Sequence, residues 1–261
     1  MFKKIPLELK SALLIVLCIA LVSAYGAING AFTQSNDKPR SEEEKLSLKQ
    51  SIALKAVEEY ERWHKNGTMQ ETDSGAISIL MQYWTLGAIP LPTTKQLQSS
   101  SWQFQHPWSA VFISWVMQEA GAGNSFYYAN AHSKYIVWAR ENAKNYESTL
   151  FAAYDIQNEK SAWPEPGDLI CMNRRNKQFN LQTINASCIS HCDIVVEVNK
   201  AQGFITAIGG NICQTVSKRI VWLDDDGFID TSKNWKVLNE EENNPEGSQR
   251  QIFGIIKVRS N

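Results

Sequence analysis

Residues 191–198 (HCDIVVEV) decide the fold, because their side chains alternate in character. Apolar residues occupy every second position from Cys192 to Val198, while the opposite face begins with His191 and Asp193. A period of two residues is typical of a β-strand with its two faces in different surroundings. The sequence therefore predicts a strand that carries a histidine on its polar face.

Further strands and helices are predicted outward from this segment. We expect strands over residues 168–172, 204–208, 216–223 and 253–258. Before them, apolar residues recur at helical spacing over residues 47–64, 77–84, 106–121 and 133–145. Because helices come first and an antiparallel sheet follows, the order indicates an α+β domain.

Composition excludes two classes of protein. The chain has 261 residues with 26 Lys and Arg against 27 Asp and Glu, a formal net charge of −1. This balance provides no field for a polyanion, so we do not expect nucleic acid as a partner. With 43% hydrophobic and 20% charged residues, the chain is too apolar to be intrinsically disordered.

The first residues predict export. Residues 11–28 (SALLIVLCIALVSAYGAI) carry no charge and follow a short segment with three lysines. Small residues at 22–24 suit a cleaved signal peptide, whereas the uncharged stretch continues far enough to span a membrane. We favour a membrane anchor over residues 1–31, a polar linker over 32–46 and a folded domain over 47–261. Both interpretations place that domain outside the cytoplasm.

Three residues carry the chemistry that the sequence suggests. Ser109 lies in the first turn of its helix, where backbone N–H groups and the helix dipole favour developing negative charge. His191 is a candidate general base, and Asn211 could orient its ring through an imidazole N–H. Ser109 is therefore a candidate nucleophile, although a serine at this position is also a common helix cap.

Four motifs add a family resemblance. They are residues 108–115 (WSAVFISW), 166–170 (PGDLI), 190–196 (SHCDIVV) and 208–211 (IGGN). In this order they resemble the nucleophile helix, strand entry, histidine strand and third-residue strand of CHAP domains, over roughly residues 102–259. CHAP domains belong to the NlpC-type, papain-like superfamily of amidohydrolases and peptidases. The resemblance implies a papain-like/NlpC-type fold, with N-terminal helices packed on a small antiparallel sheet, and cleavage of amide bonds in peptidoglycan peptides.

The chain departs from the family where the catalytic cysteine is expected. Ser109 stands at that position, and a serine hydroxyl does not ionise near neutral pH as a thiol does. His191 would then have to remove the proton during attack, with Asp193 or Glu197 as further groups able to supply charge. Two hypotheses follow: a hydrolase with Ser109 as its nucleophile, or an inactive CHAP-like domain that binds peptidoglycan or an envelope partner as a scaffold.

Other residues complete the expected site. We select Trp108, His132 and Arg174 as candidate substrate-binding residues, since His132 begins a helix and Arg174 could bind a peptide carboxylate. Four cysteines of the exported part, Cys171, Cys188, Cys192 and Cys213, allow three disulfide pairings that the sequence does not distinguish. A metal site at residues 188–192 fits poorly, so no metal or cofactor is expected.

The expected setting follows from the anchor and the resemblance together. We expect a single-pass protein of the bacterial inner membrane with its hydrolase domain in the periplasm, or a secreted periplasmic protein if a signal peptide is removed. The expected partners are peptidoglycan, the inner membrane and an envelope-spanning protein complex.

Overall fold

A computed structural model describes residues 46–87, 90–144, 149–156, 162–174, 178–233, 235–238 and 251–259. All of them belong to one compact unit, which begins at Leu46. The helices are α2 (Leu48–His64), α3 (Ser74–Trp84), α4 (Thr94–Leu97), α5 (Ser100–Gln105), α6 (Ser109–Glu119) and α7 (His132–Ala143), with a short 3₁₀ turn, η1 (Gly123–Ser125). The strands are β1 (Phe151–Asp155), β2 (Leu169–Asn173), β3 (Ser190–Asn199), β4 (Phe204–Ile212), β5 (Thr215–Trp222), β6 (Lys236–Val237) and β7 (Ile252–Val258).

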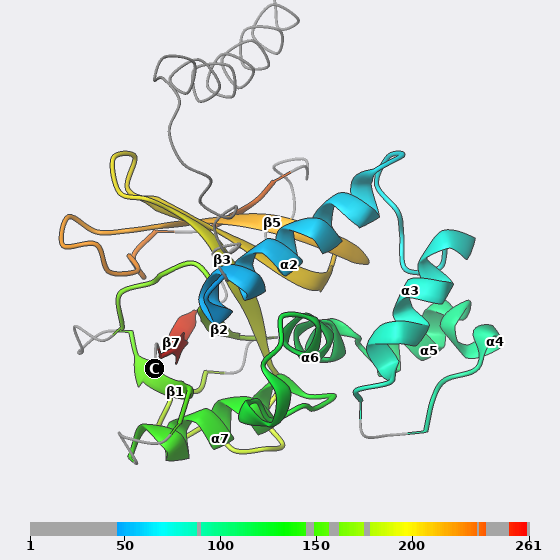
Figure 1. Cartoon of the computed structure of the whole chain (residues 1–261), viewed down its shortest axis with the longest axis horizontal. Helices are drawn as coiled ribbons and strands as arrows, with labels where there is room; N and C mark the ends of the chain where they lie inside the picture. The colour runs from blue at the N-terminus through cyan, green and yellow to red at the C-terminus, as the bar shows by residue number, and fades with distance from the viewer. Residues whose placement is uncertain are drawn as a thin grey trace, which may run out of the picture. The chain divides into compact units, whose positions relative to one another are not determined.

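The described strands form one antiparallel sheet in the order β1-β7-β2-β3-β4-β5-β6. The last strand, β7, therefore inserts between β1 and β2. Helices α2, α6 and α7 pack on the sheet, and α3 packs on α6 (Figure 1). Because β1 and β2 are buried on both faces, they read as apolar runs without a clear alternation.

Two apolar clusters lie on the two faces of the sheet. The larger cluster joins the helices to strand residues such as Cys171 and Ile194, and the smaller one is built almost entirely from strand and loop residues such as Ile170 and Met172. Adjacent residues of β2 thus enter different clusters, as the pleat requires.

An aromatic group fixes the start of α6, where Ser109 lies. Trp108 is fully buried and stacks on Trp63, with ring centroids 5.0 Å apart. Its indole Nε1–H donates a hydrogen bond of 2.8 Å to Glu71 Oε2. The residue before Ser109 is therefore held both by ring packing and by a buried hydrogen bond.

Strands β3 and β4 separate at the ends that approach α6. Their pairing runs from Asn199–Phe204 to Ile194–Ile208 and stops there. Beyond this point β4 carries two glycines that allow close packing: a Cβ on Gly209 would lie 1.7 Å from Asp193 Oδ1, and one on Gly210 would lie 2.6 Å from Phe112. The candidate site lies where the two strands stop pairing.

The fold-class prediction requires a correction. The described chain is a mixed helix and antiparallel-sheet domain, and none of its helices is long and apolar enough to cross a membrane. The longest, α2, has 17 residues and carries charged side chains along its length, whereas a span needs about 20 mostly apolar residues. The anchor predicted over residues 1–31, and all but the last residue of the predicted linker, lie outside the described residues.

The close packing of β4 against α6 generates a test by substitution. Gly210→Ala is expected to lower the free energy of unfolding by about 1–3 kcal/mol, because the added methyl overlaps Phe112 and Trp108. Gly254→Ala on β7 is the matched control, since its nearest neighbour atom is 3.4 Å away. Chemical denaturation of both variants measures the difference, and equal stabilities would contradict the packing described.

Candidate functional site

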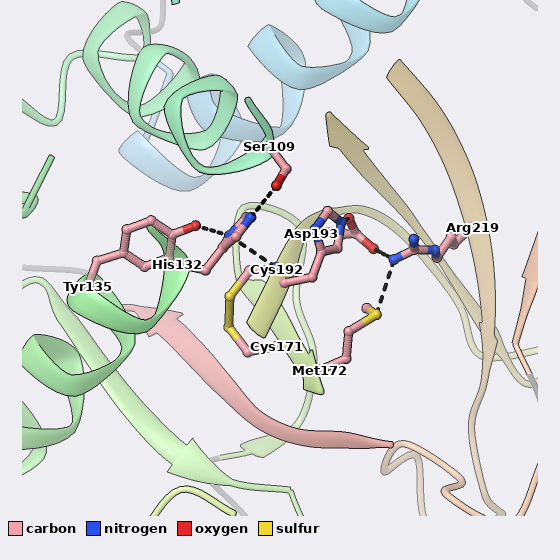
Figure 2. Close-up of a disulfide and its surroundings, with 9 residues drawn as sticks. Ser109, His132, Tyr135, Cys171, Met172, Cys192, Asp193 and Arg219 are labelled. Atoms are coloured by element: carbon pink, nitrogen blue, oxygen red, sulfur yellow. Dashed lines mark hydrogen bonds and ion pairs between the residues drawn. A yellow bond between two sulfur atoms is a disulfide. The ribbon is translucent and has the colours of Figure 1, made fainter. Parts of the chain in front are cut away.

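The hydroxyl of Ser109 is hydrogen-bonded to a histidine from another helix. Ser109 Oγ lies 2.7 Å from Nε2 of His132, the first residue of α7 (Figure 2). Both side chains are buried, with 1% and 4% of their surface exposed. The tertiary structure thus brings together two residues 23 positions apart, at the first turns of α6 and α7.

The other ring nitrogen of His132 determines which tautomer is present. The backbone N–H of Cys192 donates to His132 Nδ1 over 3.2 Å, and the Tyr135 hydroxyl also bonds this nitrogen. A backbone N–H can only donate, so Nδ1 carries no proton and the neutral ring is protonated at Nε2. His132 therefore donates to Ser109 Oγ and is not a base for it.

The second histidine, His191, is held by a carboxylate. Its Nε2 lies 2.8 Å from Asp193 Oδ1, and the Arg219 guanidinium pairs with the other carboxylate oxygen (Figure 2 labels Asp193 and Arg219). Asp193 accepts the Nε2–H, so the lone pair of the neutral ring lies at Nδ1. That Nδ1 is buried and has no hydrogen-bond partner in the structure.

The two imidazoles are close neighbours with opposite functions. Their ring centroids are 4.9 Å apart. His132 presents an N–H to the Ser109 hydroxyl, whereas His191 has a lone pair without a donor. The Ser109 hydroxyl proton lacks an acceptor in its bond to His132, because the His132 nitrogen is itself the donor. The site therefore holds a His132 N–H that is bonded to Ser109 and a His191 Nδ1 that bonds no donor, and no hydrogen bond joins Ser109 to His191.

Burial keeps both rings neutral. Desolvation lowers the pKa of His191 to about 4, although Asp193 acts in the opposite direction. Desolvation, followed by the neighbouring His191, also lowers the pKa of His132 well below its ordinary value. Burial favours the protonated form of Asp193, but Arg219 and His191 outweigh it, so the pKa of Asp193 lies below its usual value. Near pH 7 the site contains two neutral imidazoles and one carboxylate.

The start of α6 supplies further hydrogen-bond donors. The first intrahelical bond joins the Phe112 N–H to the Trp108 carbonyl. The N–H groups of Ser109, Ala110 and Val111 therefore have no acceptor within the helix. Such groups, with the helix dipole, favour negative charge beside the Ser109 hydroxyl.

A disulfide braces the floor of this site. Cys171 on β2 and Cys192 on β3 are directly paired across the strands and form the bridge, with Cα atoms 4.2 Å apart (Figure 2). This bridge belongs to the one of the three pairings that would also join Cys188 to Cys213. Because Cys192 is bridged, it is not available as a metal ligand, and the described ranges contain no cluster of His, Cys, Asp and Glu that could hold a metal ion.

The predicted site residues take different positions. Ser109 and His191 both belong to the site, but the hydrogen bond of Ser109 runs to His132, which the sequence predicts as a substrate-binding residue. Asn211 bonds neither nitrogen of His191, since Asp193 occupies Nε2 and Nδ1 has no partner. It lies near the end of β4 with a φ of 54°, where the pairing of β4 with β5 is irregular between Gly209 and Ile212.

Two of the predicted substrate-binding residues differ in solvent exposure. Trp108 is fully buried and belongs to the aromatic core, so its ring offers no surface to a substrate. Arg174 follows the last residue of β2 and is partly exposed. After burial, its charge is among the causes that lower the pKa values of His132 and His191, as expected of a cation close to the site.

Sequence reasoning missed most of the supporting residues. Arg219 on β5 reaches Asp193 on β3 across β4, which carries the small residues Ala207 and Gly209 between them. The small residues can be seen in the sequence. Only the strand order shows that they leave space for Arg219 to reach Asp193. The contribution of Tyr135 had no signal beyond its place one turn after His132.

The fold and site define a class: an α+β domain with a buried serine, two histidines and a carboxylate-guanidinium pair. Residues 72–250 match the DUF2272 family, described as "Uncharacterized protein conserved in bacteria". This match covers more than half of the chain, so the chain belongs to that family. No curated protein and no solved structure matches it. The resemblance to CHAP and NlpC-type domains therefore stays a prediction.

The tautomers can be observed directly. At pH 8 we expect His132 and His191 both to carry the proton on Nε2, because Nδ1 of His132 accepts a backbone N–H and Nε2 of His191 donates to Asp193. Long-range ¹H–¹⁵N correlation spectra of the rings distinguish the two nitrogens. His106 is an internal contrast: its Nδ1 lies 3.0 Å from the Trp102 carbonyl, so its proton belongs on Nδ1. A His132 ring protonated on Nδ1 would contradict the site described.

The pKa of His191 generates a prediction on stability. Between about pH 4 and 6.5 the unfolded chain binds a proton at this position that the folded chain does not, so stability falls as the pH is lowered through this range. One proton corresponds to about 1.4 kcal/mol per pH unit. Urea unfolding between pH 4.5 and 7.5 should show a smaller slope in His191→Gln than in the wild type. Identical slopes would mean that His191 titrates normally in the folded state.

Proposed function

We propose that this chain is a hydrolase that cleaves an amide or peptide bond in the peptide stems of peptidoglycan, with Ser109 as its nucleophile and His191 as its base. One observation carries the proposal: the Ser109 hydroxyl accepts a hydrogen bond of 2.7 Å from His132 while a buried, unpartnered His191 Nδ1 lies in the adjacent ring. The chemistry rests on these residues, and the choice of peptidoglycan rests on the resemblance to CHAP domains.

The attack needs a proton acceptor for Ser109. Ser109 makes no hydrogen bond to His191 in the structure, so the proposed step requires the side chains around Ser109 to move first. As Oγ then bonds to the carbonyl carbon, its proton passes to His191 Nδ1, and the resulting imidazolium keeps its Nε2–H on Asp193. Asp193 stays ionised because Arg219 pairs with it. The carboxylate therefore stabilises the imidazolium, as the sequence predicts for Asp193 or Glu197, and it also orients the ring, which the sequence predicts for Asn211.

Two groups of donors stabilise negative charge in this step. His132 donates its Nε2–H to Ser109 Oγ, and this hydrogen bond stabilises the negative charge that develops on Oγ as it loses its proton. The N–H groups of the first turn of α6 have no helical acceptor and can bind the carbonyl oxygen as it becomes an oxyanion. The His132 ring is held for this purpose by the amide of Cys192.

In the remaining steps His191 first gives up this proton and then takes one from water. The imidazolium of His191 gives its proton to the leaving nitrogen as the carbon–nitrogen bond breaks, which leaves an ester on Ser109. Water then attacks the ester, His191 Nδ1 accepts a proton from that water, and the same proton returns to Ser109 Oγ as the acid product departs. No metal or external cofactor is needed in this sequence.

The disulfide supports an extracytoplasmic location for this activity. Cys171 and Cys192 are both buried, and disulfides persist mainly in oxidising compartments such as the periplasm. Peptidoglycan is found in that compartment, so the redox requirement and the proposed substrate agree.

A second candidate function is favoured by the burial of the site. Ser109 is only 1% exposed, and His132 and His191 are nearly as deeply buried. A substrate carbonyl therefore reaches Ser109 only after the groups around it move. If they do not move, the domain is a scaffold that binds peptidoglycan or an envelope partner and cleaves nothing.

Digestion of purified sacculi distinguishes the two functions. We expect the wild-type protein to release new muropeptides, detected by liquid chromatography and mass spectrometry, and Ser109→Ala to lower the rate by a factor on the order of 10⁶. Ser78→Ala, an exposed serine on α3, is the control and should cleave at the wild-type rate.

The outcomes separate cleanly. If the wild type releases no muropeptides but binds sacculi as well as Ser109→Ala does, the hydrolase proposal fails and the scaffold function stands. If only Ser109→Cys cleaves, the wild type is likewise a scaffold, and its site still activates a thiol. The muropeptide masses identify the cleaved bond.

A further inference from the structure

A cavity lies apart from the Ser109 site. Its volume is about 800 Å³, within the range of pockets that hold small ligands. Three loops surround it: residues 163–166, the turn between β3 and β4, and the turn that follows β5. Its wall includes Tyr154 and Leu223 from the smaller apolar cluster, and it shares no residue with the hydrogen-bonded group around Ser109.

The loops around this cavity are held in place by hydrogen bonds. The Leu223 N–H donates to the Gly203 carbonyl over 2.8 Å, which joins the turn after β5 to the β3–β4 turn. The Trp163 carbonyl accepts a hydrogen bond from Lys257 on β7. Loops held in this way form a cavity before any ligand arrives, and such preorganisation lowers the cost of binding.

Two of the cations in the wall are already neutralised. Lys257 bonds Glu165 Oε2 over 2.8 Å and also pairs with the buried Asp168. Lys49 lies 2.5 Å from the same Glu165 oxygen. These hydrogen bonds from Lys257 and Lys49 lower the pKa of Glu165 to about 2, so it stays ionised. The four side chains balance in charge and act as part of the scaffold.

Other charges in the wall are not neutralised in this way. Within the described ranges, Lys200, Asp225 and Asp226 take part in no ion pair, yet all three line the cavity. The Lys200 ammonium lies 5.7 Å from the centre of the Trp163 ring. Trp163 is 45% exposed and lines the cavity. The cavity thus combines an aromatic surface with separate positive and negative groups.

We propose that this cavity binds a short peptide carrying both an ammonium and a carboxylate group, with its apolar part on Trp163. Asp225 and Asp226 bind the ammonium, and Lys200 binds the carboxylate. A neutral glycan also packs on tryptophan, but it offers no charges to match those of Lys200 and the two aspartates. The charges therefore favour a zwitterionic peptide over a sugar.

The proposal goes beyond the hydrolase function and does not depend on it, because binding here needs no cleavage at Ser109. The probe is trialanine, with N-acetyl-trialanine and trialanine amide as analogues that each lack one charge. Isothermal titration calorimetry of the full chain should show that either modification weakens binding about tenfold, the cost of one charged hydrogen bond.

Charge-matched variants make the test specific. In Asp225→Asn/Asp226→Asn, trialanine and its N-acetyl form should bind equally, and in Lys200→Gln, trialanine and its amide should bind equally. Ser109→Ala and Lys95→Gln, an exposed residue of α4, should bind trialanine as the wild type does. These controls separate this site from the Ser109 site.

Three results would overturn the proposal. The first is no measurable heat with trialanine at millimolar concentration. The second is binding that both analogues and both charge variants leave unchanged. The third is binding of N,N′,N″-triacetylchitotriose in place of trialanine, which would assign the cavity to a glycan.

Discussion

The buried pair of Arg219 and Asp193 is the interaction on which the site depends. Both side chains are almost completely withdrawn from water, and neither charge could stay buried alone. Removing one partner of such a pair generally costs about 3–5 kcal/mol, because the other is left without compensation. Arg219 also lies 4.3 Å from the Trp235 ring, so the guanidinium is held by a carboxylate and by an aromatic face.

This pair decides the character of the two histidines. Because Asp193 accepts the Nε2–H of His191, that ring presents an unprotonated Nδ1. The splitting of β3 from β4 at Ile194–Ile208 leaves the Cys192 N–H without a strand partner on that edge, and it bonds His132 instead. Two chemically identical rings in contact thus become one acceptor and one donor. The difference comes from the hydrogen bond that the other nitrogen of each ring makes.

The same constraints explain why the site is closed. Helix α6 approaches β4 closely because Gly210 carries no side chain, and Asp193 packs against Gly209 for the same reason. Close packing removes water from the serine and both histidines, which strengthens their electrostatic interactions and also restricts access. Catalysis and a purely structural function place different demands on this burial: the first needs an opening movement and the second does not.

Local pattern determined much of the architecture. The alternation in residues 191–198 and the helical spacing before them predicted helices followed by an antiparallel sheet. Strand β1 was missed, because its residues are apolar without alternation when both faces are buried. Ser109 and His191 were identified from their positions in a helix and a strand, which are local properties of the sequence.

Only the tertiary structure decided the partners. Asp193 replaced Asn211 behind His191, and His132 became the direct neighbour of Ser109, because strand splitting and helix placement set those distances. Arg219 is 26 residues from Asp193 and reaches it across an intervening strand. Spacing along the chain reports which residues share an element, whereas hydrogen bonds between elements depend on how the elements pack, and that information is not local.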